Sequence, residues 1–141
     1  MSIDLTGDIK NVIDGALERA GRAPAVGYID QDGYPAVSHR GSTHVISPNQ
    51  LAIWTRNPND GLATGVAANP KVTVAFFDPA GSPLMLSMRG TARVDASRND
   101  EVYAGIGGAE QGYDPDKNGV AVIIDVETVR GFGHEGPISQ G

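Results

Sequence analysis

The feature that most constrains this fold is a series of short alternating apolar runs joined by tight turns. Turn residues at 31–33 and 47–50 separate consecutive runs. Because a parallel pair of strands needs a crossover of a dozen or more residues, connections this short favour antiparallel pairing. We therefore expect a mainly β fold, a compact antiparallel barrel with peripheral helices. The predicted strands span residues 25–30, 34–46 with a bend at Gly41, 51–55, 72–77, 84–94 with a bulge or tight bend at Gly90, and 120–126. Residues 129–132 are expected to be a hairpin partner of the last strand, and the tail from Gly133 is expected to be loose.

Three segments carry helical signals. Apolar side chains recur at i, i+3, i+4 and i+7 over residues 8–20, which predicts one amphipathic helix. A short helix fits residues 61–68, with Asn59 or Asp60 as its cap. A third helix is predicted over residues 97–106, where a Ser-x-x-Asp pattern resembles a capping box. These helices fill gaps between strands, so the 141 residues are expected to form one domain, residues 1–141.

The charge balance and the residue content limit the partners of the chain. The formal net charge is −6, with 11 Lys and Arg against 17 Asp and Glu, so no basic face for nucleic acid or anionic lipid is expected. The absence of cysteine removes disulfides and thiolate chemistry. No apolar run approaches the roughly 20 residues of a membrane span, and no secretory leader is recognisable. We expect a cytoplasmic protein.

Several familiar catalytic and binding motifs fail. The glycines of residues 105–108 follow a helical pattern and lack the spacing of a dinucleotide fingerprint. The histidines form no i, i+4 pair, so no metal site is predicted. No Gly-x-Ser-x-Gly elbow supports a hydrolase, and no catalytic residue can be assigned. The acidic stretch at Asp114 and Asp116 is expected to be a solvated loop.

One region is denser in chemically useful side chains. Residues 38–44 interrupt a strand with serines, histidines, an arginine and a glycine, and residues 54–57 end the next strand with Trp, Thr, Arg and Asn. The predicted helix start at residues 60–61 offers backbone N–H groups to an anion. Arg40 and Arg56 with the nearby hydroxyls would therefore suit a phosphate monoester. In the alternative interpretation, the two arginines pair with acids at strand ends.

The order of these segments resembles the FMN-binding split barrels related to pyridoxamine 5′-phosphate oxidase. The likeness covers roughly residues 9–94, and the strand at 120–126 fits the same barrel. The segments that carry it are Gly33-Tyr34-Pro35-Ala36-Val37-Ser38-His39-Arg40, Leu51-Ala52-Ile53-Trp54-Thr55-Arg56-Asn57, Ala68-Asn69-Pro70-Lys71-Val72 and Arg89-Gly90-Thr91-Ala92.

The resemblance implies a six-stranded antiparallel split β-barrel that forms a homodimer with one FMN at each end of the interface. It implies that the last segments help to build the partner's pocket. It also implies a small flavin-dependent oxidoreductase, a flavoprotein that exchanges a hydride with a small organic substrate or a reduced nicotinamide. The cofactor-binding residues that it suggests are Ser38, His39, Arg40, Gly41, Trp54, Thr55, Arg56, Gly61 and Leu62.

The chain departs from that family at the start of the short helix, and the sequence leaves other functions open. Where the oxidases carry a basic pair at the start of the short helix, this chain has Gly61 and Leu62. Either Arg40 and Arg56 bind the phosphate, or a different ligand is bound, or the site is empty. A deazaflavin in place of FMN, a flavin or haem carrier without turnover, and a scaffold with a lost pocket are the alternatives; haem would need an axial histidine.

Overall fold

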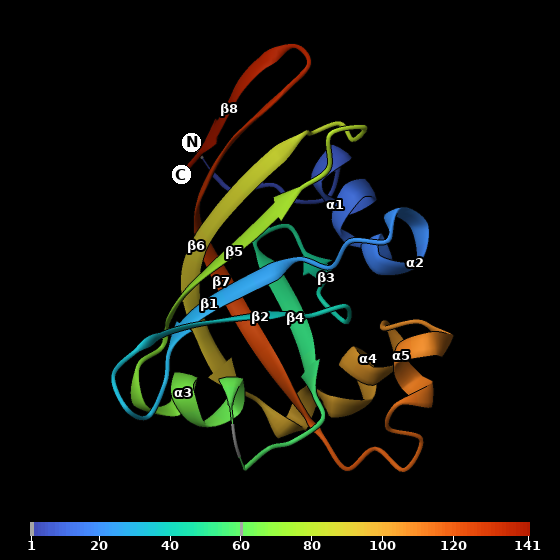
Figure 1. Cartoon of the computed structure of the whole chain (residues 1–141), viewed down its shortest axis with the longest axis vertical. Coiled ribbons are helices and arrows are strands. Elements are labelled where there is room, and N and C mark those ends of the chain that lie inside the picture. The colour runs from blue at the N-terminus through green and yellow to red at the C-terminus, as the bar shows by residue number, and fades with distance from the viewer. Residues whose placement is uncertain (1, 60) are drawn as a thin grey trace.

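The computed structural model describes residues 2–59 and 61–141, and its described residues build one antiparallel sheet with short helices around it (Figure 1). The predicted mainly β, antiparallel architecture is confirmed, and the sheet of the described residues has eight strands where the resemblance implies six. Asp60, one of the two predicted helix caps, lies outside the described residues. The strands are β1 (Ala25–Ile29), β2 (Pro35–His39), β3 (His44–Ser47), β4 (Gln50–Thr55), β5 (Lys71–Phe77), β6 (Met85–Val94), β7 (Val120–Gly133) and β8 (Gly136–Gln140).

The sheet is open, and this opening positions the site. Its strand order is β2-β1-β5-β6-β7-β4-β3, with β8 added to β7. The two edge strands β2 and β3 are therefore consecutive in the chain, and residues 40–43 join one edge to the other across the opening. The prediction of one strand over residues 34–46 is wrong, because the chain leaves the sheet at Arg40 and enters its opposite edge at His44.

The C-terminal part forms more regular structure than expected. Residues 120–133 are one continuous strand, not a hairpin of two strands, and the true hairpin partner is β8. The tail from Gly133 is consequently part of the sheet, and Figure 1 shows this hairpin extending beyond the barrel. Both chain ends lie side by side there, since Gln140 Oε1 accepts the Asp4 N–H at 2.7 Å.

The helices are short. They are α1 (Asp8–Ile13), α2 (Ala16–Ala20), α3 (Leu62–Ala68), α4 (Asn99–Ala104) and α5 (Gly108–Gly112), with a 3-10 turn at Ala96–Arg98. None of the helices in the described ranges has the length and apolar character that a membrane span requires.

Two of the helix predictions need correction. The single helix expected over residues 8–20 is divided into α1 and α2 by Gly15, whose φ of 65° lies in the left-handed region. The helix expected from Ser97 is also different. Asp95, not Ser97, supplies the cap, and it caps the 3-10 turn by accepting the Ser97 N–H. The expected loop at 105–119 includes α5.

Two groups of buried apolar side chains hold these elements together. The larger group fills the inside of the curved sheet and takes in α1 and α3. The smaller group packs α4 against β4 and β7, and Trp54 and Tyr103 meet there edge to face with ring centroids 5.2 Å apart. The smaller group thus fixes residues 99–106 beside the end of β4, where the sequence predicts functional residues.

Candidate functional site

The segment across the opening of the sheet is held by hydrogen bonds at both of its ends. At the β2 end, the Arg40 N–H donates to Pro24 O at 2.8 Å. The Arg40 carbonyl accepts the Thr43 hydroxyl at 2.7 Å, which tightens the turn. At the β3 end, the buried Ser42 hydroxyl accepts the Trp54 N–H at 3.0 Å. This segment is therefore a fixed bridge between the edges, and its side chains have defined positions.

A cavity of about 340 Å³ lies at this bridge, within the size range of small-molecule sites. Five of the nine predicted cofactor-binding residues line it. They are His39, Arg40, Gly41, Trp54 and Arg56. The rest of the lining comes from α2 and the loop after it, from the bridge itself and from the segment after α4, namely Leu17, Ala23, Ser42, Glu110 and Tyr113.

Arg40 is half-buried and points its guanidinium toward the start of α3. Its Nε donates to Ser38 Oγ at 2.8 Å, which places the predicted Ser38 behind the cation. A Cβ built on Gly61 would lie 3.7 Å from Arg40 Nη2 and 3.8 Å from the Tyr28 hydroxyl, so these three residues meet. Burial lowers the pKa of Arg40; Tyr28 opposes that shift and the charge of Arg56 adds to it. A bound anion would offset both the desolvation of the Arg40 guanidinium and its repulsion by Arg56.

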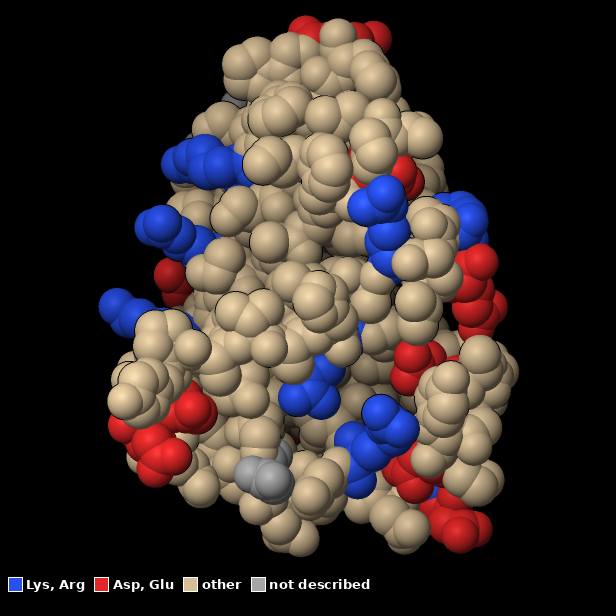
Figure 2. Space-filling view, viewed as in Figure 1, with Lys and Arg blue, Asp and Glu red and all other residues tan. Residues whose placement is uncertain are grey.

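Arg56 follows the last residue of β4 and contributes the second cation. Its Cζ lies 5.1 Å from the centroid of the Tyr113 ring, a cation–π contact. No ion pair joins Arg40 or Arg56 to a carboxylate within residues 2–59 and 61–141. In Figure 2, Lys and Arg side chains appear on this face between the positions of α3 and α5 in Figure 1.

Trp54 is 4% exposed and belongs to the smaller buried group as well as to the cavity wall. Its indole N–H donates to Asp114 Oδ2 at 2.9 Å. Asp114 is buried, and its carboxylate also accepts the N–H groups of Asn118 and Gly119. The expectation of a solvated loop at this position is therefore wrong. The buried carboxylate therefore fixes the indole that forms part of the cavity wall.

The remaining predicted residues lie outside the lining of the cavity. The Thr55 hydroxyl donates to Val120 O at 2.8 Å, and Thr55 is 2% exposed. Leu62 is 1% exposed, and its side chain belongs to the core. Gly61 precedes α3 next to Arg40. None of these three, nor Ser38, is part of the lining in the described residues.

Sequence reasoning missed three contributors: Tyr28, Glu110 and Tyr113. Tyr28 is one position in an alternating strand, which gives no sign that its hydroxyl meets Arg40. Glu110 and Tyr113 come from the glycine-rich stretch that the sequence suggests is a plain loop. A Cβ on Gly41 would overlap Glu110 Oε1 and lie 2.8 Å from Leu17 Cδ2, so this glycine admits both side chains to the bridge.

The histidines have different environments. His39 is exposed at the end of β2 and lines the cavity, whereas His134 is exposed in the turn before β8. His44 is 6% exposed, its Nδ1 lies 2.7 Å from Ser42 O, and its Nε2 has no hydrogen-bond partner in the described chain. In the described ranges no group of three or more His, Asp or Glu is placed to bind a metal ion.

Comparison by sequence finds no matching family model and no matching curated protein. Comparison of structures finds many similar chains. A pyridoxamine 5′-phosphate oxidase-related, FMN-binding protein from Nostoc punctiforme aligns with a TM-score of 0.69 at 14% identity, covering 96% of this chain and 87% of that chain. HupZ of Group A Streptococcus aligns with a TM-score of 0.68 at 19% identity, covering 88% and 90%. An F420 reductase aligns with a TM-score of 0.62 at 15% identity, covering 85% and 94%. At these identities the likeness shows the fold.

Proposed function

We propose that this chain, which has the split-barrel fold of pyridoxamine 5′-phosphate oxidase-related proteins, is a small flavin-dependent oxidoreductase. It binds FMN, or a deazaflavin, in the cavity beside the bridge of residues 40–43. The observation that carries this proposal is the pair of guanidiniums, Arg40 and Arg56, which approach one cavity without an ion-pair partner in the described residues. Two such cations suit a phosphate group.

The side chains of the site divide into cations and positioning groups. Arg40 and Arg56 bind the phosphate, and Ser38 holds Arg40 through its Nε. Gly41 admits the side chains of Leu17 and Glu110 to the bridge, because it has no side chain of its own. Trp54, fixed by Asp114, gives a rigid aromatic wall that excludes water. A bound flavin supplies two-electron hydride exchange, which these side chains by themselves do not.

A deazaflavin is the second candidate cofactor, and the F420 reductase among the structural neighbours favours it. The cavity offers the same arginines to either molecule, so binding affinity decides between them. The carrier alternative predicts bound cofactor without reduction by NADH or NADPH. A haem carrier predicts a Soret band, with His39 as the histidine that lines the cavity.

A homodimer is part of the proposal, because the split-barrel resemblance implies one. Light scattering at micromolar concentration should then give twice the chain mass.

The test of the proposed function is an absorbance spectrum of the purified protein followed by fluorescence titration with FMN and with a deazaflavin. Bound flavin, or quenching with a micromolar or tighter dissociation constant, is the expected result. Reduction of the bound cofactor by NADH or NADPH would then separate an enzyme from a carrier. A protein that binds neither molecule contradicts the proposal.

A further inference from the structure

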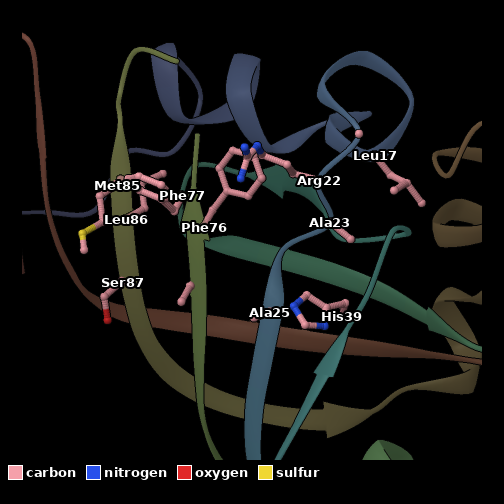
Figure 3. A pocket seen from close by; sticks show the side chains of 12 residues that line it. Leu17, Arg22, Ala23, Ala25, His39, Phe76, Phe77, Met85, Leu86 and Ser87 are labelled. Atoms are coloured by element: carbon pink, nitrogen blue, oxygen red, sulfur yellow. The ribbon is translucent and has the colours of Figure 1, made fainter. Parts of the chain in front are cut away.

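A second cavity, of about 650 Å³, lies on the outer side of the sheet next to the candidate cofactor site (Figure 3). Its lining is mostly apolar and comes from α2, the loop after it, β1, β5 and β6, with His39 at the end of β2. Leu17, Ala23 and His39 line both cavities, so the two are neighbours. A molecule in the second cavity would lie beside one in the first.

The floor of this cavity is flat because small residues occupy successive strands. His39 pairs with Ala25, Ala25 with Ala75, and Ala75 with Ser87, which makes one row across β2, β1, β5 and β6. With strands about 4.8 Å apart, the row is roughly 14 Å long. The two alanines in its middle leave space above the sheet. This shape suits a flat ring system.

Phe77 and Met85 form an apolar wall at one side of the floor. They face each other across β5 and β6, two residues along from Ala75 and Ser87, and they are 50% and 39% exposed. Exposed apolar surface next to a flat floor favours a ligand with an apolar body.

Two polar groups remain at the edges of the cavity. Figure 3 shows Arg22 extending from the loop after α2 toward β5, and His39 turned toward Ala25. Neither side chain makes a hydrogen bond or an ion pair with another residue in the described ranges. The cation of Arg22 is thus available to a ligand, and it would bind a carboxylate by charge-assisted hydrogen bonds.

We infer that this cavity binds the substrate of the proposed enzyme and that the substrate is a flat, apolar carboxylate. Its ring lies on Ala25 and Ala75 against Phe77 and Met85, and its carboxylate is bound by Arg22. His39 lies between this ligand and the cofactor cavity. The role as substrate rests on the proposed function, whereas the binding of such an anion does not.

The experiment uses 2-naphthoate as the probe and the full chain freed of any flavin, with calorimetric titration at low ionic strength. The neutral 2-naphthalenemethanol is the matched ligand, since it keeps the ring and loses the charge. Arg22→Ala should weaken 2-naphthoate binding about tenfold or more. Arg89→Ala removes a cation from the same face, away from this cavity, and should change binding less than about twofold. The alcohol should bind about tenfold more weakly than the acid.

Ala75→Leu places a larger side chain on the floor and should abolish 2-naphthoate binding. A thermal unfolding curve checks that this variant is folded. If it is not, Arg22→Ala and the alcohol decide the question without it. Equal binding of acid and alcohol, or unchanged binding by Arg22→Ala, overturns the inference.

FMN titration of the same variants separates this inference from the proposed function. Arg22→Ala should bind FMN as the unmodified chain does. FMN binding without 2-naphthoate binding, in both flavin-free and flavin-loaded protein, overturns the inference alone. Binding of 2-naphthoate without FMN binding overturns the proposed function and leaves the anion site supported.

Light scattering with and without 2-naphthoate should give the same mass. If 2-naphthoate binds only when a dimer dissociates, a second copy of the chain fills the cavity, and the inference is overturned.

Discussion

The indole N–H of Trp54 donates to the Asp114 carboxylate at 2.9 Å, joining the end of β4 to a turn 60 residues away. The same carboxylate accepts the N–H groups of Asn118 and Gly119, each at 2.9 Å. Burial raises the pKa of Asp114, but these hydrogen bonds and the charge of Arg56 outweigh it and hold the pKa below its ordinary value. One carboxylate therefore orders the turn and fixes the aromatic wall of the candidate site.

Asp114→Ala should destabilise the protein by about 2–4 kcal/mol, because it leaves three N–H donors without their acceptor. Urea unfolding at pH 7 measures the loss. Asp116→Ala, in the same turn but exposed, is the control and should change stability by less than about 0.5 kcal/mol. The folded-state pKa of Asp114 is lowered, so its stabilisation is present above the ordinary value of 3.8 and is lost as the pH falls through the folded-state value. Equal effects of the two variants would mean that Asp114 has no structural role.

The buried His44 should give the stability of the protein a second pH dependence, at higher pH than that of Asp114. Burial lowers its pKa; the hydrogen bond to Ser42 O and the charges of Asp14 and Glu101 oppose this shift, and Lys10 adds to it. The unfolded chain therefore binds more protons below the ordinary value of 6.5, and stability should fall with decreasing pH from there down to the folded-state pKa.

His44→Asn tests this dependence, because an amide keeps a donor near Ser42 O and does not titrate. Urea unfolding between pH 5 and 7.5 should give a shallower pH dependence for the variant than for the unmodified chain. His134→Asn, in an exposed turn, controls for the loss of a histidine as such. A variant with the full pH dependence would show that His44 is not the group responsible.

The imidazole of His44 leaves no space for a side chain at Gly105. A Cβ at this position would lie 2.7 Å from His44 Nε2, so Gly105→Ala forces the imidazole or the end of α4 to move. The expected cost is about 1–3 kcal/mol of unfolding free energy. Gly112→Ala is the control, since a Cβ there meets nothing within 4 Å. In the double variant Gly105→Ala/His44→Ala the imidazole is gone, so the losses of unfolding free energy should not be additive. Strict additivity would count against a contact between a side chain at 105 and His44.

The strands were predictable from local alternation, but their partners were not. Alternation continues from Tyr34 to Ile46, and nothing local shows that its two halves occupy opposite edges of the sheet. Only Gly41, predicted as a bend, marks the place where the chain leaves one edge for the other.

The continuity of β7 was hidden by a β-bulge. The pairing with β6 shifts between Arg89 and Gly90, so Glu127 is an extra residue that reverses the alternation without ending the strand. Gly90 was predicted as a bulge or tight bend, and the register shift confirms it. The sequence thus predicted the irregular position at Gly90 on β6, but it did not predict the extra residue, Glu127, on β7.

The candidate site was predictable where its residues are consecutive and unpredictable where they are distant. Residues 39–41 and 54–56 stood out by their chemistry. Tyr113 and Asp114 did not, because a buried acid is recognisable only by donors that the fold brings to it. A polar, glycine-rich stretch gives no sign of that.

The proposed phosphate contacts predict a loss of cofactor affinity. Arg40→Ala and Arg56→Ala should each weaken FMN binding by roughly 1.5–3 kcal/mol, because each removes a charge-assisted hydrogen bond. Arg93→Ala removes an exposed cation that pairs with Asp125 outside the cavity, and it should have little effect. Fluorescence titration measures the three affinities. Unchanged affinity in both cavity variants would rule out this arrangement of the phosphate.

Removing the charge of Glu110 should change FMN affinity in the opposite direction. Its carboxylate lines the same cavity as Arg40 and Arg56 and lies against Gly41, where it repels any bound anion. Glu110→Gln keeps the size of the side chain and removes the charge, so FMN should bind more tightly by about 0.5–1 kcal/mol, or roughly two- to fivefold. Since salt screens exposed charges, the gain should shrink at 0.5 M NaCl. Asp116→Asn, an acid outside the cavity, should leave FMN affinity unchanged. Weaker binding by Glu110→Gln would mean that the carboxylate accepts a hydrogen bond from the ligand, and the phosphate would then have to lie elsewhere than between the two arginines.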